Sequence, residues 1–149
     1  MTTTWDGLEA ADEPPFGAQI IVYRGEGKLL EILLLHRAHH GPDFEGDWAW
    51  TPPSGCRFPG EAIAACAERE LQEEAGLRLP MEQTDFGSAE WPLYMAAMDD
   101  RKTVYLIDPE HDKYAWMPAS QAIERCEPAI VKEPLRRAVQ LLRKRSLQK

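Results

Sequence analysis

The chain has 149 residues and a formal net charge of −8, with 44% hydrophobic and 28% charged residues. This length suits a single domain with a substantial core, and the composition is ordinary for a soluble globular protein. An acidic chain has no electrostatic footprint for a nucleic-acid polymer or an anionic membrane. It can still bind a small phosphorylated ligand if metal ions supply positive charge locally.

The three cysteines, Cys56, Cys66 and Cys126, show no C-x-x-C spacing. A disulfide framework and a zinc site are therefore poorly supported, and a reduced, cytoplasmic setting is expected. No apolar run approaches about 18 residues, and the N-terminus lacks a basic region followed by an apolar one. Neither a membrane span nor a secretory signal is predicted.

The first part of the chain predicts a lead-in followed by a hairpin. Residues 1–16 are rich in small and acidic residues and include two adjacent prolines, so we expect a flexible lead-in to a single domain over residues 17–149. Residues 17–24 read as a strand that ends at a glycine-containing turn. Residues 29–37 form a nearly continuous apolar run, which predicts a second strand buried on both faces.

The middle of the chain contains the clearest helix signal. Residues 39–46 carry glycines, a proline and charges and are expected to form an exposed loop, and residues 48–51 a short strand stopped by prolines. Residues 61–75 follow a Pro-Gly pair and are rich in alanine, which predicts a helix. This helix is expected to end at Gly76 with a left-handed cap.

The remaining segments complete the expected layered fold. Residues 85–98, 102–107 and 114–117 read as extended segments, and residues 118–126 and 131–145 as helices. The order β-β-α-β-β-α-α predicts an α/β domain, with a mixed sheet covered by helices in an α/β/α arrangement.

Three glutamates of the predicted first helix form a local cluster. Glu70, Glu73 and Glu74 are spaced i, i+3 and i+4, so they share an arc of about 100° on the helix surface. Neighbouring like charges repel unless a positive group lies among them, and the simplest such group is Mg²⁺ or Mn²⁺. The alternative is a solvated charged face. However, Glu70 and Glu74 border the predicted core-facing stripe, which consists of Ile63, Ala64, Ala67, Leu71 and Ala75.

The stretch from Gly55 to Leu77 has the spacing G-x5-E-x7-R-E-L-x-E-E-x-G-L. It resembles the Nudix box in every defining position, whereas outside the box only the order of elements and a later tryptophan-containing segment are similar. The resemblance implies a Nudix-like α/β/α sandwich that contains the box loop-helix-loop. It also implies a hydrolase that uses Mg²⁺ or Mn²⁺ to cleave a diphosphate linkage in a small nucleotide-type substrate.

The resemblance assigns roles to five charged residues of the box. Glu70, Glu73 and Glu74 would hold the metal, and Glu61 and Arg69 would pair with each other to fix the loop against the helix. Arg69 is grouped with the catalytic residues Glu70 and Glu73, because its planar fork suits holding carboxylates in place.

The resemblance leaves the identity of the general base open. Glu70 and Glu73 are the candidates within the box. The downstream candidate is Glu110, in a segment similar to one that supplies an extra carboxylate in several Nudix enzymes. Glu110 is also expected among the metal ligands, although a solvated loop residue is an equal alternative. Gly55 and Gly76 would let the backbone turn so that loop and helix meet.

Residues outside the box bear on the substrate. Tyr94 lies 17 residues after Leu77, where enzymes acting on diadenosine polyphosphates often carry a tyrosine, and Pro92 lies close to a proline associated with ADP-ribose hydrolysis. Each has a plain structural alternative in a strand, and Ser54 before the box departs from many relatives. We expect a dinucleoside polyphosphate or a nucleotide, with ADP-ribose or a nucleotide sugar as the alternative.

Two kinds of side chain are candidates for substrate contacts. Trp48 and Trp50 precede the box loop and could stack a base or belong to the core. Arg37 could reach a phosphate or form a surface ion pair. A nucleotide sensor without turnover is a rival class, although such a protein would not need the complete catalytic set, and a homodimer is possible.

Overall fold

The computed structural model of the chain describes residues 2–3 and 7–148. Within these residues, the strands of the main sheet are β3 (Gly17–Arg24), β4 (Glu31–Arg37), β5 (Trp50–Thr51), β6 (Ser54–Cys56), β7 (Glu82–Thr84), β8 (Leu93–Ala97) and β9 (His111–Pro118). They form a mixed sheet in the order β5-β4-β3-β8-β7, in which β6 also pairs with β3 and β9 with β4. The predicted hairpin is present as the antiparallel pair β3 and β4, whereas β3 and β8 run parallel.

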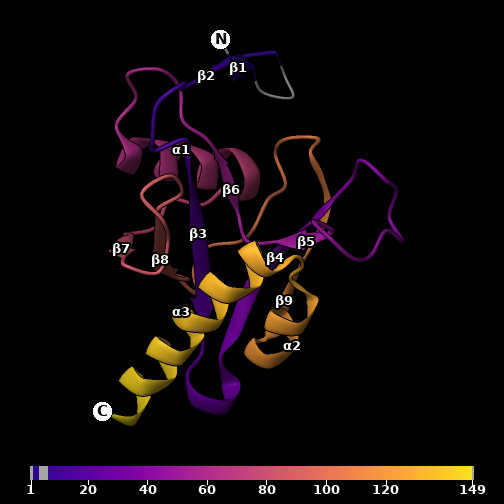
Figure 1. Cartoon of the computed structure of the whole chain (residues 1–149). Helices are drawn as coiled ribbons and strands as arrows, with labels where there is room; N and C mark the ends of the chain where they lie inside the picture. The colour runs from indigo at the N-terminus through magenta and orange to yellow at the C-terminus, as the bar shows by residue number, and fades with distance from the viewer. Residues whose placement is uncertain (1, 4–6, 149) are drawn as a thin grey trace.

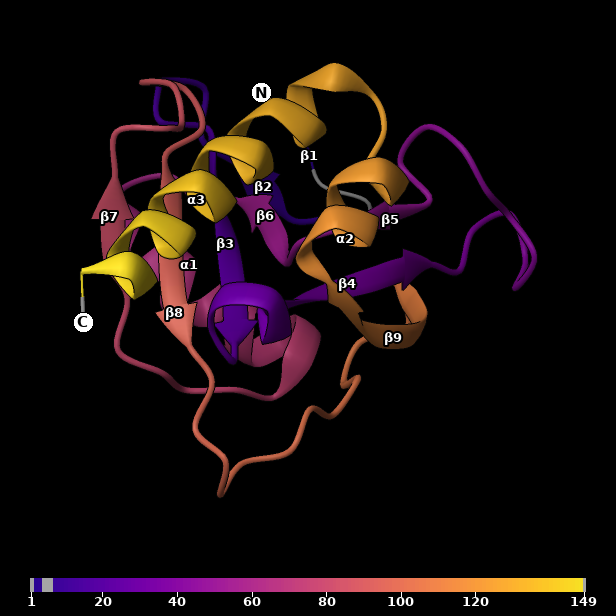
Figure 2. The ribbon, with the colours of Figure 1, turned by 90° about the horizontal axis from the view of Figure 1, so that it is seen from below.

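Helices cover both faces of this sheet (Figure 1). Helix α1 (Ile63–Ala75) packs on one face, and α2 (Ala119–Arg125) and α3 (Ala129–Leu147) pack on the other, where Figure 2 shows them lying side by side. This arrangement confirms the predicted α/β/α sandwich. Among the described residues, no helix combines the length and apolar character needed to cross a membrane.

Strand alternation divides the core into two layers. In β3, Ile20 packs toward α1, and the next residue, Ile21, packs toward α2 and α3. In β4, Leu33 and Leu34 divide in the same way, and both are completely buried. The prediction that the second strand is buried on both faces is therefore confirmed.

Helix α1 is oriented by a stripe of small and apolar side chains. Cys66 is fully buried in this stripe, whereas Ala64, expected to face the core, is exposed. The carboxylate of Glu74 is also buried, with 2% of the residue exposed. Gly76 ends the helix with φ at 68°, a left-handed conformation that glycine adopts without steric cost.

Two expectations about the segments after α1 are wrong. Residues 102–107 do not form a strand; the backbone amide of Tyr105 donates to the Ala75 carbonyl at the end of α1, so the segment crosses the helix terminus. Residues 85–98 are not one extended segment, because a bend over residues 85–92 separates β7 from β8. Neither β6 nor β7 was predicted, because each is only three residues long and carries little hydrophobic pattern.

Part of the lead-in expected over residues 1–16 contacts the rest of the domain. A short pair, β1 (Thr2–Thr3) and β2 (Glu9–Ala10), precedes a stretch that contacts the box loop. The backbone amide of Ala11 donates to the Arg57 carbonyl, and the Arg57 side chain donates to the Pro15 carbonyl. Residues 11–15 are therefore tied to the loop that leads into α1.

Candidate active site

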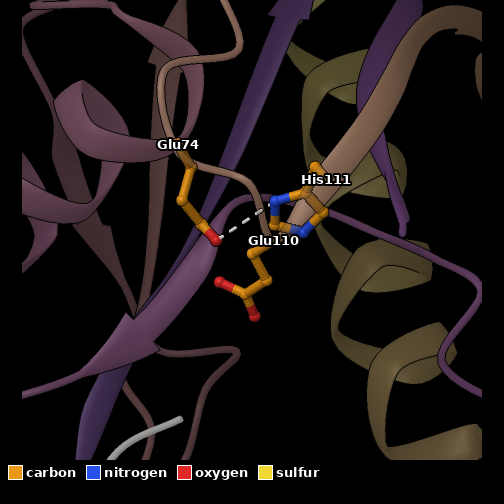
Figure 3. A group of neighbouring side chains, drawn as sticks. All are labelled: Glu74, Glu110 and His111. Atoms are coloured by element: carbon orange, nitrogen blue, oxygen red, sulfur yellow. Dashed lines mark ion pairs between the residues drawn. The ribbon is translucent and has the colours of Figure 1, made fainter. Parts of the chain in front are cut away.

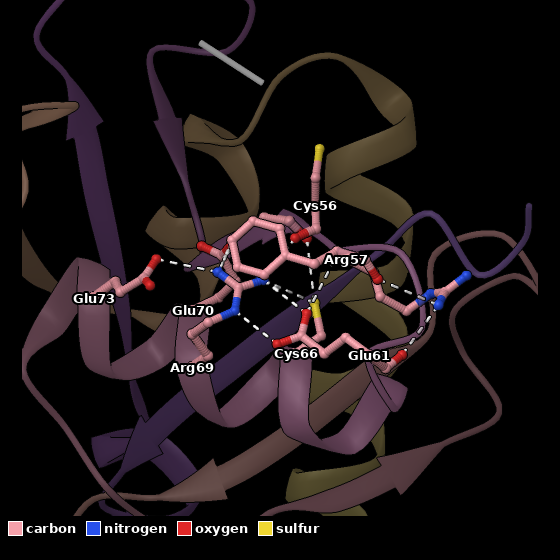
Figure 4. Close-up of polar contacts among 9 residues, drawn as sticks. Cys56, Arg57, Glu61, Cys66, Arg69, Glu70 and Glu73 are labelled. Atoms are coloured by element: carbon pink, nitrogen blue, oxygen red, sulfur yellow. Dashed lines mark hydrogen bonds and ion pairs between the residues drawn. The ribbon is translucent and has the colours of Figure 1, made fainter. Parts of the chain in front are cut away.

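The Arg69 side chain is the centre of a polar network between the box loop and α1 (Figure 4). Its Nε and Nη2 donate to the two carboxylate oxygens of Glu61 at 2.8 and 2.9 Å, in a fork-to-fork pair. Nη2 also donates to the Cys56 carbonyl at 2.8 Å, and the guanidinium stacks on the Phe58 ring. The hydrogen bonds from Arg69 hold the pKa of Glu61 below its ordinary value. The structure thus places the two residues expected to pair in direct contact.

The same guanidinium fixes two of the predicted metal-binding carboxylates. Nη1 of Arg69 donates to Glu70 at 2.9 Å and to Glu73 at 3.2 Å. Side-chain exposure is 12% for Glu70 and 50% for Glu73. The carboxylate of Glu70 is therefore held inside the site, and that of Glu73 lies at its open edge.

Gly55 allows the carboxylate of Glu70 to reach the box loop. A Cβ atom at this position would lie 2.0 Å from Cδ of Glu70 and within 2.4 Å of both its carboxylate oxygens. A side chain at this position would displace the Glu70 carboxylate, so Glu70 can keep its place only beside a residue without a Cβ. Close approach, and not an unusual backbone conformation, accounts for the glycine.

The carboxylates behind this opening are poorly solvated. Burial raises the pKa of Glu70 to about 7, against the opposing effect of Arg69. Burial and then the charges of Glu110 and Glu70 raise the pKa of Glu74 well above its ordinary value. Ionised carboxylates that repel one another in a partly dry site are stabilised by a hard cation, so these residues fit a divalent metal.

A second group of potential ligands consists of Glu74, Glu110 and His111 (Figure 3). Oε1 of Glu74 accepts a hydrogen bond from the backbone amide of Ser54 at 2.7 Å, while Oε2 lies 3.6 Å from Nδ1 of His111. One ligand atom from each of Glu74, Glu110 and His111 lies within 4.8 Å of the others. Strand β9 brings His111 here by pairing with β4, so only the proximity of His111 to Glu110 in sequence could have indicated it.

Two cavities lie beside these residues. The carboxylate cavity, of about 670 Å³, is lined by Glu70, Glu73 and Glu110, among others. The tryptophan cavity, of about 430 Å³, is lined by Trp48 and Ile130, among others. Both cavities share Arg37, Ser54 and Trp91. The phosphate-binding candidate Arg37 thus lies between a carboxylate-rich space and an aromatic one.

Two expected substrate-binding residues line neither cavity. Trp50 is 6% exposed and packs edge-on against His36 in the core beneath α2 and α3. Tyr94 is 4% exposed on the α1 side of the sheet, where its hydroxyl donates to Gln83. Strand alternation directs both side chains into the core, so neither of them reaches the two cavities.

Trp48 and Trp91 line the tryptophan cavity instead. Trp48 precedes β5 with φ at 68°, and it is 44% exposed. Its ring lies 5.9 Å from the Arg37 guanidinium carbon. Trp91 is half-buried in the bend just before β8 and was not predicted, because a single tryptophan beside a proline carries no periodic signal.

Comparison with known proteins identifies the family. The NUDIX domain model matches residues 13–141. The chain is 29% identical over 148 residues to the octanoyltransferase of Myxococcus xanthus. The match covers 91% of this chain but only 40% of the length of that protein.

Solved structures share the fold. The Ap4A hydrolase of C. elegans, in a binary complex, has 26% identity and a TM-score of 0.67, with 85% of this chain and 96% of that chain covered. The NUDIX domain of Shewanella oneidensis NrtR, complexed with ADP ribose, has 16% identity and a TM-score of 0.63, with 91% and 90% covered. Because the family model spans most of the sequence, the chain belongs to the NUDIX family.

Proposed function

We propose that the chain is a divalent-metal-dependent pyrophosphohydrolase of small nucleotide derivatives, with a dinucleoside polyphosphate or a nucleotide as the preferred substrate. The observation that carries this proposal is the position of Arg37 between the carboxylate cavity and the tryptophan cavity. A nucleotide has an anionic part and a planar aromatic part, and these two spaces match them in order. The 26% identity to an Ap4A hydrolase supports the choice of substrate class.

In this proposal, the box carboxylates hold the cation and Arg69 holds the carboxylates. Glu70, Glu73, Glu74 and Glu110 are the proposed ligands. When bound, a divalent cation neutralises phosphate oxygens and promotes the attack of water at phosphorus. Arg69 keeps its guanidinium on Glu61 and on two of these carboxylates, so it preserves their positions without contacting substrate.

A group that accepts a proton from the attacking water is also required. Glu70 is the first candidate, because its carboxylate lines the carboxylate cavity and is held in place there by Arg69. Glu73 is the second candidate, and its greater exposure makes it the weaker one.

The nucleobase is proposed to enter the tryptophan cavity. Trp48 presents an exposed ring there, and Gln19 supplies an amide that can donate and accept hydrogen bonds. Trp48→Ala is expected to raise KM about tenfold with little change in kcat, since base stacking is lost while the carboxylates stay in place. Trp116→Phe, on a tryptophan that lines neither cavity, is the matched control.

The proposal is tested by incubating the chain with Mg²⁺ or Mn²⁺ and a panel of substrates. The panel contains a dinucleoside polyphosphate, nucleoside triphosphates, ADP-ribose and a nucleotide sugar, and released products are identified by chromatography and phosphorus NMR. Preferred turnover of the first two classes, lost in Glu73→Gln, is the expected result. Preferred cleavage of ADP-ribose or the sugar would correct the substrate class, and tight binding without cleavage of any compound would instead identify a sensor.

A further inference from the structure

His111 places an imidazole nitrogen at the back of the carboxylate site. The residue is 6% exposed, and its buried Nδ1 atom makes no hydrogen bond. Leaving a buried polar atom unsatisfied costs about 1–3 kcal/mol, so such an atom calls for an explanation. Figure 3 shows the ring nitrogen directed toward the carboxylate of Glu74, with the Glu110 side chain beside it.

The distances from Nδ1 to the nearby carboxylate oxygens suit joint binding of one metal ion better than they suit a direct hydrogen bond. Nδ1 lies 3.6 Å from Oε2 of Glu74 and 3.9 Å from Oδ1 of Asp108. Both separations exceed the usual range of about 2.7–3.2 Å for a hydrogen bond from nitrogen to oxygen. Two ligands bound at about 2.1 Å from one ion lie about 3–4 Å apart, a range that includes the Glu74–His111 separation.

The surroundings fix these groups in position. The backbone amide of Ser54 occupies Oε1 of Glu74, which leaves Oε2 facing the imidazole. Glu110 lines the carboxylate cavity, so the group is reached from the same space as the box carboxylates. The cluster therefore consists of more than neighbouring acids, because it includes a buried nitrogen with no other hydrogen-bonding role.

We infer that Glu74, Glu110 and His111 bind one divalent transition-metal ion, with Nδ1 of His111 as a nitrogen ligand, and that this ligand makes the site prefer Mn²⁺ or Co²⁺ over Mg²⁺. Imidazole binds first-row transition metals well, whereas Mg²⁺ favours oxygen ligands and retains its water. The inference rests on the metal dependence proposed above. It adds a ligand and a metal preference that the box carboxylates alone would not give.

The direct test is pulsed electron paramagnetic resonance of the metal-free protein loaded with one equivalent of Mn²⁺. Coordination by an imidazole gives a hyperfine coupling to ¹⁴N, which changes to the ¹⁵N pattern in protein grown with ¹⁵N-labelled histidine. We expect this coupling in the unaltered chain, its loss in His111→Gln, and its retention in His39→Gln. His39 is an exposed histidine in the loop after β4 and serves as the matched control.

Metal affinities provide the second measurement. His111→Gln is expected to weaken Mn²⁺ binding at least about tenfold and to change Mg²⁺ binding less than about threefold. Bound Mn²⁺ without nitrogen coupling, or equal losses for the two metals, would overturn the inference while leaving the proposed metal dependence intact. Absence of Mn²⁺ binding would overturn both. If His111→Gln does not fold, the labelling result on the unaltered chain decides the question, because it needs no variant.

Discussion

Glu70 is expected to make the metal-free chain less stable as the pH rises toward neutrality. Burial raises the pKa of this carboxyl from 4.5 to about 7 in the folded chain. Between these two values the folded state holds a proton that the unfolded state has lost. The contribution of Glu70 to the free energy of unfolding therefore falls as the pH rises through this window.

The size of the effect follows from the change in proton affinity. A rise from 4.5 to about 7 corresponds to about 3 kcal/mol, at about 1.4 kcal/mol for each tenfold change. His111 acts in the opposite direction, because burial lowers its pKa from 6.5 to about 4 and its contribution grows over a similar window. Glu74 acts in the same direction as Glu70, because burial raises its pKa as well. Only a comparison with Glu70→Gln therefore isolates the carboxyl of Glu70.

The assay is urea unfolding in the presence of EDTA, from about pH 5 to about pH 8. The free energy of unfolding of the unaltered chain should fall relative to that of Glu70→Gln by about 3 kcal/mol across this range. Saturating Mn²⁺ should restore most of the loss near neutral pH, since it binds the ionised site in the folded state. A difference between the two proteins that stays constant with pH would refute the reasoning.

The remaining predictions concern the box. Gly55→Ala should push the Glu70 carboxylate aside, so activity falls at least about tenfold while the melting temperature changes little. Glu68→Ala, at an exposed position of α1 that lines neither cavity, is the control, and unchanged activity in Gly55→Ala would contradict the steric argument. Glu73→Gln should abolish most metal-dependent turnover without loss of the fold, and near-normal activity would remove Glu73 from the site. Arg69→Ala should cost about 3 kcal/mol in the free energy of unfolding as well as activity, and an unchanged melting temperature would contradict its structural role.

The positions of the two cavities determine how a substrate would lie in the proposed site. A substrate that places its phosphates among the carboxylates must pass Arg37 to reach the tryptophans. Arg37 can thus set the register between the bond that is cleaved and the base that is recognised.

Local sequence determined the box and its helix. The spacing of Glu70, Glu73 and Arg69 needs only the 3.6-residue period of a helix to place these side chains together, and Gly76 marks the end of that helix. The alternation of apolar residues in the first two strands similarly predicted their burial. These features depend on neighbours along the chain, so they can be predicted without the fold.

Long-range pairing decided the rest of the site. Strand β9 pairs with β4, and this pairing carries Glu110 and His111 to the buried end of Glu74. The backbone at Trp48 directs its ring outward, while Trp50, two residues later, enters the core. Such contacts join residues distant in sequence and depend on which face of the sheet each side chain meets. The sequence by itself therefore predicted the reaction chemistry, whereas only the tertiary structure placed His111 beside Glu74 and left the Trp48 ring exposed at a cavity.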